Sequence, residues 1–122
     1  MLRGSFTQTS GYELANQVIN QKPRPAALFA ANNFIAIGAM KAFQGFDLSV
    51  PEDIALVGFA DLPEALVMFP FLPVAAQPAY EMAQEATRLL LTRIAGEAPE
   101  EHQEIVLPTE LIIRQSSGRA LV

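Results

Sequence analysis

Twelve residues, Val50-Pro51-Glu52-Asp53-Ile54-Ala55-Leu56-Val57-Gly58-Phe59-Ala60-Asp61, encode a turn, a buried strand and the loop that follows it. Pro51 restricts the backbone of the turn, and the side chain of Asp53 can bond its own main chain. The apolar run 54–57 is typical of a parallel strand that helices cover on both faces. Gly58 is expected to end the strand, so a loop follows at its carboxyl end, where open α/β sheets bind ligands. The segment predicts an α/β domain with a parallel sheet and flanking helices.

Apolar periodicity on both sides of this stretch predicts further helices and strands in alternation. Ser10 followed by Glu13 is a capping pattern for a first helix, which Pro23 stops. Gly45 and Gly96 are expected to stop the second helix and the long last helix. The expected strands are 26–30, 54–57, 74–77, 104–108 and 110–114, the later helices are 32–43, 61–68 and 78–95, and 115–122 is expected to be a tail.

The length and apolar content of the chain indicate one domain rather than two. The chain has 122 residues, 51% of them hydrophobic, a formal net charge of -5 and no cysteine. Because the chain is acidic and its basic residues are scattered, we do not expect it to bind the phosphate backbone of a nucleic acid by itself. Neither a secretory signal nor an apolar run long enough to span a membrane is present, so we expect a cytoplasmic protein with no membrane contact.

The sequence contains none of the patterns that indicate enzyme chemistry. Phosphate-binding glycine loops, metal-ligand spacings and nucleophile elbows are missing. Glu52 and Asp53 are adjacent carboxylates, but neighbours in a turn point apart, so they are interpreted as turn residues. His102 lies in a polar, Glu-rich loop and is expected to be solvated. We therefore expect a protein that is not an enzyme, with no catalytic residue, metal ligand or cofactor.

Five blocks of sequence, in chain order, resemble the C-terminal part of LacI/GalR-family bacterial transcription regulators. The second block contains Leu28-Phe29-Ala30-Ala31-Asn32-Asn33, and the third is the stretch 50–61. The five blocks are spread over nearly the whole chain: 4–11, 28–40, 50–61, 72–78 and 107–116.

The resemblance implies a partial type I periplasmic-binding-protein-like fold. In that fold two α/β lobes enclose a small effector, and a helix-turn-helix head that precedes them binds operator DNA. Residues 1–122 would then be a single partial effector-binding and dimerisation domain without the DNA-binding head. Residues 1–72 would belong to the C-terminal lobe, and residues 73–114 would cross back and complete the N-terminal lobe.

The resemblance also implies effector-binding positions. Phe6 falls where the family places an aromatic ring against the effector, Asn32 where an amide or carboxylate bonds sugar hydroxyls, and Gln77 on the hinge crossover. Asn32 also begins a helix, where asparagine is a good N-cap. Ala60 stands where the family usually has the first of two aspartates, whose carboxylate accepts bonds from effector hydroxyls. Asp61, one place later, is the remaining acidic candidate.

A homodimer interface is implied as well. In the family, the helix after the Asn pair and the loop after the Gly-aromatic-Asp turn pack across a two-fold axis. The corresponding residues here are Ile35, Ile37, Met40, Val67, Met68 and Phe69. The same residues fit a core equally well, because periodicity does not separate a core from an interface.

The resemblance favours one function and leaves two alternatives open. The favoured function is effector sensing and dimerisation in a LacI/GalR-type regulator, with a sugar or related metabolite as effector and operator DNA bound only through a head absent from this chain. One alternative is a fragment of a periplasmic sugar-binding protein, which shares the fold. The other is a stand-alone domain that acts only by association.

Overall fold

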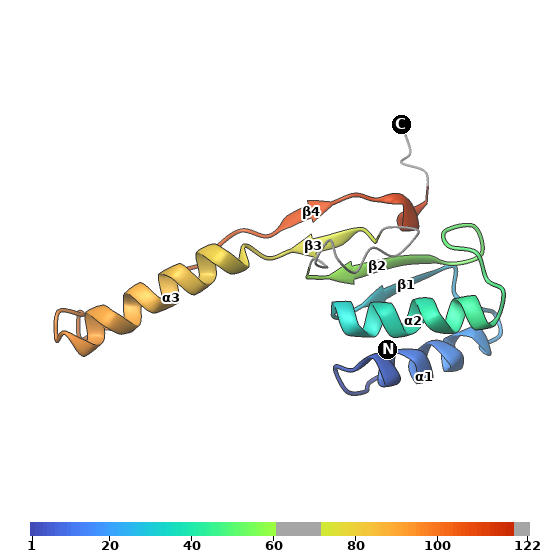
Figure 1. The fold of residues 1–122 in the computed structure, drawn as a ribbon, viewed down its shortest axis with the longest axis horizontal. Coiled ribbons are helices and arrows are strands. Elements are labelled where there is room, and N and C mark those ends of the chain that lie inside the picture. The colour runs from blue at the N-terminus through green and yellow to red at the C-terminus, as the bar shows by residue number, and fades with distance from the viewer. Residues whose placement is uncertain (61–71, 119–122) are drawn as a thin grey trace. The chain divides into compact units, whose positions relative to one another are not determined.

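The computed structural model describes residues 1–60 and 72–118 (Figure 1). The chain forms two compact units, one comprising Met1–Ala76 with Leu111–Val122 and the other Gln77–Glu110. The helix expected at 61–68 lies outside the described residues, as do four candidate site residues: Asp61, Val67, Met68 and Phe69. The assignment of residues 73–114 to an N-terminal lobe stays a prediction.

A mixed four-stranded sheet forms the first unit's centre. Its strands are β1 (Ala27–Ala30), β2 (Ala55–Phe59), β3 (Val74–Ala76) and β4 (Glu110–Ile112), in the order β1-β2-β3-β4. The first three are parallel, with Leu28 opposite Leu56 and Gly58 opposite Val74, whereas β4 runs the other way (Figure 1). The predicted α/β fold with flanking helices is confirmed, but the sheet, which was expected to be parallel, is mixed because of β4.

Two helices cover one face of this sheet. Helix α1 (Gln8–Ile19) packs along α2 (Asn33–Gly45), and α2 lies against β1 and β2 (Figure 1). Burial alternates along β2: Leu56 and Gly58 are buried, and the other three residues of the strand are half-buried. The expectation that helices cover both faces is therefore not met within the described part of the chain.

The first helix begins earlier than the sequence pattern indicated. Thr7 is the N-cap of α1, and its hydroxyl oxygen accepts a hydrogen bond from the backbone N–H of Ser10 at 3.2 Å. The hydroxyl of Ser10 instead accepts from the backbone N–H of Ser5 at 3.0 Å. The capping role predicted for Ser10 is wrong because a hydroxyl three residues upstream already occupies that position.

The two glycines that were expected to end helices, Gly45 and Gly96, differ in their backbone conformation. Gly45 is the last residue of α2, and the left-handed residue that reverses the chain is Asp47, with a φ of 52°. Aspartate adopts this conformation more readily than most side chains, so a glycine is not required. Gly96, with a φ of 74°, follows α3 (Ala79–Ile94) as predicted.

Two predicted strands have different limits from those expected. The central strand starts at Ala55 and continues through Gly58 to Phe59, since Gly58 pairs with both neighbouring strands. Residues 104–108 form no strand. Pro108 lacks the N–H that a strand ladder requires, and Ile105 and Val106 are exposed.

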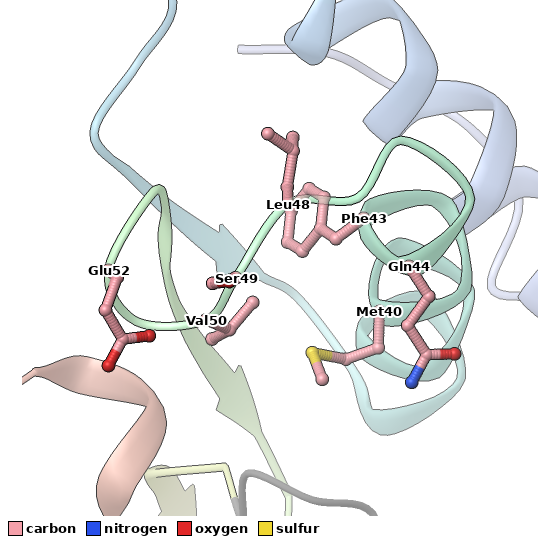
Figure 2. Close-up of a pocket in the computed structure, with 7 residues that line it drawn as sticks. All are labelled: Met40, Phe43, Gln44, Leu48, Ser49, Val50 and Glu52. Carbon is pink, nitrogen blue, oxygen red and sulfur yellow. The ribbon is translucent and has the colours of Figure 1, made fainter.

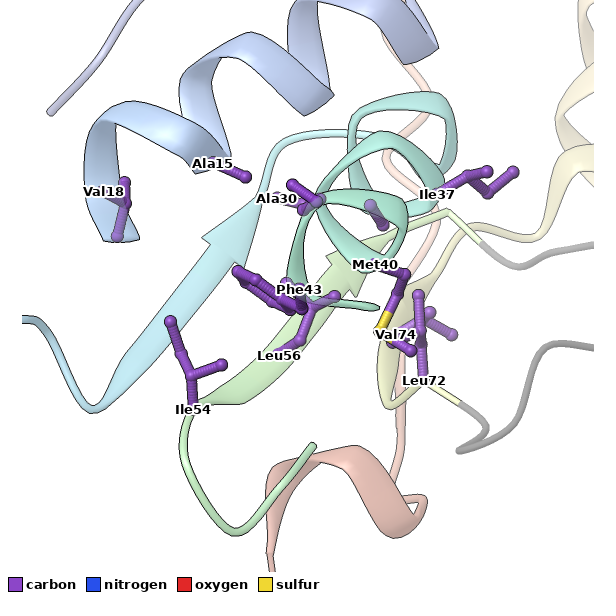
Figure 3. Packing of buried hydrophobic residues seen from close by; sticks show 13 residues of the cluster. Ala15, Val18, Ala30, Ile37, Met40, Phe43, Ile54, Leu56, Leu72 and Val74 are labelled. Atoms are coloured by element: carbon purple, nitrogen blue, oxygen red, sulfur yellow. The ribbon is translucent and has the colours of Figure 1, made fainter. Parts of the chain in front are cut away.

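The core lies between α2 and the sheet. Phe43 of α2 is fully buried in one cluster with Ile54, Leu56, Leu72 and Val74, and Figure 3 shows Leu72 and Val74 beside Met40. Alanines at 15, 36, 39 and 42 belong to the same buried cluster. Burial of this large ring and its aliphatic neighbours is the main source of stability in a small unit.

The segment expected to be a tail is attached to the sheet. Residues Gln115–Ser117 form a 3-10 helix, and the buried hydroxyl of Ser116 donates a hydrogen bond to the carbonyl oxygen of Leu56 at 2.7 Å. The guanidinium of Arg114 donates to the carbonyl oxygen of Leu72 at 3.0 Å. For residues 115–118 the tail prediction is wrong: Ser116 is polar and part of no periodic pattern, yet its hydroxyl satisfies a buried backbone carbonyl. Residues 119–122 lie outside the described residues.

Removing the buried hydroxyl tests this attachment. Ser116→Ala is expected to lower the free energy of unfolding by about 1–2 kcal/mol, because a buried carbonyl loses its donor. Ser117→Ala is the control, since its exposed hydroxyl donates to the Arg114 carbonyl, and its loss is expected to cost below about 0.5 kcal/mol. Urea unfolding measures both, and equal losses would show that Ser116 does not anchor the segment.

In the second unit, α3 buries none of its residues completely. Its apolar side chains are largely exposed, including Leu90 at 58% and Ile94 at 72%. A shallow hollow of about 220 Å³ is lined by Leu89, Leu90, Arg93, His102 and Gln103. Across residues 1–60 and 72–118, no helix has both the length and the apolar character needed to cross a membrane.

Candidate effector-binding edge

The carboxyl ends of β1 and β2 bring two candidate residues to one edge of the sheet. Ala30 pairs with Gly58 in the parallel register, and Asn32 and Ala60 each lie two residues beyond that pair. Loops that leave adjacent parallel strands at the same end lie next to each other. Both residues therefore lie at the carboxyl edge of the parallel strands, and their role in binding stays a prediction.

Asn32 is the N-cap of α2, which confirms the capping interpretation. Its side-chain carbonyl oxygen, Oδ1, accepts a hydrogen bond from the backbone N–H of Ile35 at 2.8 Å, and the residue is half-buried. An asparagine has a second polar group, the Nδ2 amide with two donors, which is bonded to no other described residue. Capping therefore uses only the acceptor side of Asn32.

Phe6 is exposed immediately before the first helix. It precedes the N-cap Thr7, and 69% of its surface is accessible, so it does not belong to the core. The helices α1 and α2 begin at the same end of the unit, beside the arrowheads of β1 and β2 (Figure 1). An aromatic face is thus presented at the same end as Asn32.

Ala60 holds an unusual backbone conformation. Its φ is 65°, and its N–H donates to the carbonyl oxygen of Ala75 at 3.0 Å. The left-handed region is entered most readily by glycine, asparagine and aspartate, and less readily by alanine. The loop therefore has a backbone that suits the aspartate common in the family, without its carboxylate.

Gln77 is exposed and begins the second compact unit, directly after β3. The described edge therefore consists of Phe6, Asn32 and Ala60. These side chains can stack and donate hydrogen bonds, and they include no nucleophile. The described part of the chain also brings together no group of three His, Cys, Asp or Glu residues that would hold a metal ion.

A separate hollow lies at the opposite end of β2. Its volume is about 320 Å³, between the end of α2 and the turn before β2 (Figure 2). The turn is fixed by Asp53, whose carboxylate accepts from the backbone N–H of Ser49 at 2.8 Å, as the sequence predicted. No sequence signal marked the hollow, which is lined by Met40, Phe43, Gln44, Leu48, Ser49, Val50 and Glu52.

The described members of the predicted dimer interface are mostly buried within the chain itself. Ile37 is 5% exposed and Met40 is 3% exposed, and both belong to the core (Figure 3). Ile35 is half-buried and packs against that core. The interface stays a prediction, and Ile35 is its most accessible described member.

Variants of Asn32 separate its cap from its free amide. Asn32→Ala is expected to lower the free energy of unfolding by about 1 kcal/mol, because the Ile35 N–H loses its acceptor. Asn32→Ser is expected to change it by only a few tenths of a kcal/mol, since serine caps about as well. Thermal and urea unfolding provide the measurement. A serine variant as unstable as the alanine variant would contradict a purely capping contribution to stability.

A parallel β–α–β unit with helices packed on the sheet defines an α/β domain, in which ligands commonly bind at the carboxyl edge. Residues 2–117 match the family described as periplasmic binding protein-like domain. The chain belongs to this family, as the C-terminal part of the effector-binding domain of a LacI/GalR-family transcription regulator.

Similar proteins of known role are transcriptional repressors. The chain is 39% identical over 120 residues to the HTH-type transcriptional repressor MelR of Bacillus subtilis, covering 97% of this chain and 34% of MelR. It is 34% identical over 118 residues to the repressor PurR of Haemophilus influenzae, covering 95% of this chain and 35% of PurR. The chain thus spans about a third of the length of these relatives.

Solved structures give the same family. A LacI-family regulator from Enterococcus faecium with bound ribose superimposes with a TM-score of 0.85 at 28% identity, covering 95% of this chain and 42% of that one. The regulator CelR in complex with cellobiose has a TM-score of 0.84 at 35% identity, covering 94% and 35%.

Proposed function

We propose that this chain is the effector-sensing and dimerisation portion of a LacI/GalR-type regulator. A small molecule, a sugar or related metabolite, binds at the carboxyl edge that carries Phe6, Asn32 and Ala60. Its binding between two lobes biases their relative orientation and thereby controls DNA binding by a separate helix-turn-helix head. Such control requires an effector with different affinities for the two orientations.

One observation supports the proposal: Asn32 and Ala60 come from separate loops yet both follow the carboxyl ends of the paired parallel strands β1 and β2. Asn32 and Ala60 follow directly from the pairing of Ala30 with Gly58. Phe6 presents an exposed ring at the same end, where the two helices begin. The ribose and cellobiose complexes of similar regulators support a small organic effector at such a domain.

The uncovered apolar surface supports a larger assembly. Phe29 on β1 is 63% exposed, and in the same unit Leu111 is 65% and Ile113 68% exposed. A single small domain rarely leaves such surface open to water, and a second lobe or a second copy would cover it. The proposed homodimer is tested by sedimentation equilibrium, and a monomer at every concentration would contradict it.

The relatives' role as repressors favours binding over catalysis for this chain too. Cytoplasmic location and indirect action on operator DNA follow from the same proposal. The edge itself contributes an aromatic ring and an amide donor, which are groups that hold a ligand in place.

Reading the genomic DNA upstream of the Met1 codon, in the same frame, distinguishes the regulator from a periplasmic binding protein. Because the chain covers 34% of MelR, the proposal predicts roughly 200 further codons that encode the first lobe and a helix-turn-helix. A secretory signal at the start of that frame would instead identify a periplasmic binding protein. A stop codon close upstream would reduce the relationship to one of ancestry.

A further inference from the structure

One face of the sheet in the first unit is apolar and lies on the side away from α2. On the side of α2, strand residues such as Leu56 are buried in the core. On the other side, Phe29 of β1 pairs in register with Val57 of β2, and Phe59 of β2 pairs with Ala75 of β3. Residues opposite each other in neighbouring strands point to the same face, so these four side chains form one surface.

Strand β4, which lies beside β3, extends this surface. Ile112 packs against the core, so its neighbour Leu111 points to the other face. Leu111 is 65% exposed and Phe29 is 63% exposed, whereas Val57 and Phe59 are half-buried. We call this surface the open sheet face, and its members are Ala27, Phe29, Ala55, Val57, Phe59, Ala75 and Leu111.

Every member of the open sheet face is apolar. Parallel strands normally have both faces covered, because their side chains are apolar on both. An apolar patch that a folded unit leaves in contact with water marks a surface that binds another protein surface.

The relief of the open sheet face suits a second copy of itself. Large side chains, Phe29 and Phe59 among them, alternate with alanines at positions 27, 55 and 75. When two sheets pack face to face, the side chains of the two inner faces interdigitate, so a phenylalanine of one copy fills the space above an alanine of the other. Because the face has no charge, its pairing with itself brings no like charges together.

The helix surface that the family resemblance implies for a dimer is less suited to this role. Ile37 is 5% exposed and Met40 is 3% exposed, because both are buried in the core of their own unit. They therefore have little surface left for a contact with a partner. Phe29 and Leu111 still have most of theirs.

We propose that two copies of this chain associate through the open sheet face, with one sheet packed on the other. The inference rests on the homodimer of the proposed function and assigns the contact to the sheet instead of to α2. A face four strands wide and about four residues long measures about 19 by 13 Å, which is small for a protein interface. We therefore expect a weak dimer, with a dissociation constant of about 10–100 μM.

Sedimentation equilibrium of the full chain, at concentrations on both sides of this dissociation constant, measures the association. Phe29→Lys places an ammonium group of each copy in the contact and is expected to raise the dissociation constant by about tenfold or more. Because Phe29 is exposed in the single chain, the lysine reaches water and the fold is kept, which circular dichroism checks.

Phe46→Lys is the matched control for Phe29→Lys. It makes the same substitution at a ring that is 47% exposed, at the end of α2 and outside the open sheet face. The dissociation constant of this variant is expected to change by less than about twofold, because a charge outside the contact is solvated and screened.

A second measurement locates the contact without any substitution. Backbone amide resonances of the ¹⁵N-labelled chain are followed during dilution from the dimer to the monomer. We expect concentration-dependent shifts on three strands, at Phe29 of β1, Val57 of β2 and Leu111 of β4.

Two results would overturn the inference, and they are distinguishable. If the chain dimerises but Phe29→Lys associates as tightly as Phe46→Lys, or the shifts are confined to α2 around Ile35, the contact is not the open sheet face while the proposed homodimer stands. If the chain is a monomer at every concentration, the inference falls together with the proposed homodimer, and effector binding is unaffected.

Discussion

Phe43→Ala is expected to remove about 4 kcal/mol from the free energy of unfolding, a large part of the roughly 5–15 kcal/mol that is typical of a domain. The Phe43 ring is fully buried at the centre of the core, between α2 and the strands (Figure 3). Truncation loses the transfer free energy of the ring and leaves a cavity that the alanines nearby cannot fill. Urea unfolding followed by far-ultraviolet circular dichroism measures the change.

Phe46 is the matched control for this truncation. It is the same residue type, lies three positions later at the end of α2, and is 47% exposed. Phe46→Ala is expected to cost less than about 1.5 kcal/mol, since much of its ring already contacts water. Similar losses for the two variants would mean that the core is not organised around Phe43.

The second large effect is expected at the crossing of the two helices. Gly38 in α2 lies so close to α1 that an added Cβ would overlap the carbonyl oxygen of Gln8 and lie 2.7 Å from the backbone nitrogen of Tyr12. Both obstacles are backbone atoms, so α1 would have to move as a body. Gly38→Ala is expected to cost about 3 kcal/mol, the upper range for overpacking.

The control for Gly38 lies in the same helix. An added Cβ at Gly45 meets no heavy atom within 4 Å. Gly45→Ala is therefore expected to be neutral or to stabilise the chain by about 0.5 kcal/mol, because alanine has the higher helix propensity. Thermal unfolding of both variants is the measurement, and a harmless Gly38→Ala would show that the helices cross at a greater distance.

Sequence patterns located the elements that have strong apolar periodicity or clear stop signals. The strands around residues 28 and 56 and the long helix after Pro78 are where they were expected. Their side chains repeat with the period of the element, and this repeat is visible without the fold. The left-handed Gly96 is likewise found where the sequence placed it.

Features that depend on contacts between distant residues could not be predicted. The anchoring of Ser116 to Leu56 joins positions 60 residues apart, and nothing near Ser116 in the sequence indicates a buried partner. The close approach of α1 and α2 at Gly38 is also a tertiary contact, and glycine inside a helix usually indicates a weak helix. The periodicity of the sequence predicted that α2 has an apolar face. Only the fold shows that Ile37 and Met40 are buried in the core.

The candidate site was predicted in part. The sequence indicated that Asn32 and Ala60 follow strands, and the parallel register brings them to one edge. That Asn32 uses its carbonyl oxygen as a helix cap was an open alternative, which the bond to Ile35 decides. The left-handed backbone of Ala60 was not foreseen, because alanine is an uncommon residue in that conformation.

The central claim is that a small effector binds at the carboxyl edge of β1 and β2. The most direct measurement is a map of backbone amide shifts on the ¹⁵N-labelled chain during titration with sugars, sugar acids and carbonyl-bearing rings. The account predicts shifts at Phe6, Asn32 and Ala60 that Asn32→Ser abolishes without loss of stability. Shifts confined to the hollow lined by Met40 and Glu52, or shifts that Asn32→Ser leaves unchanged, would contradict it.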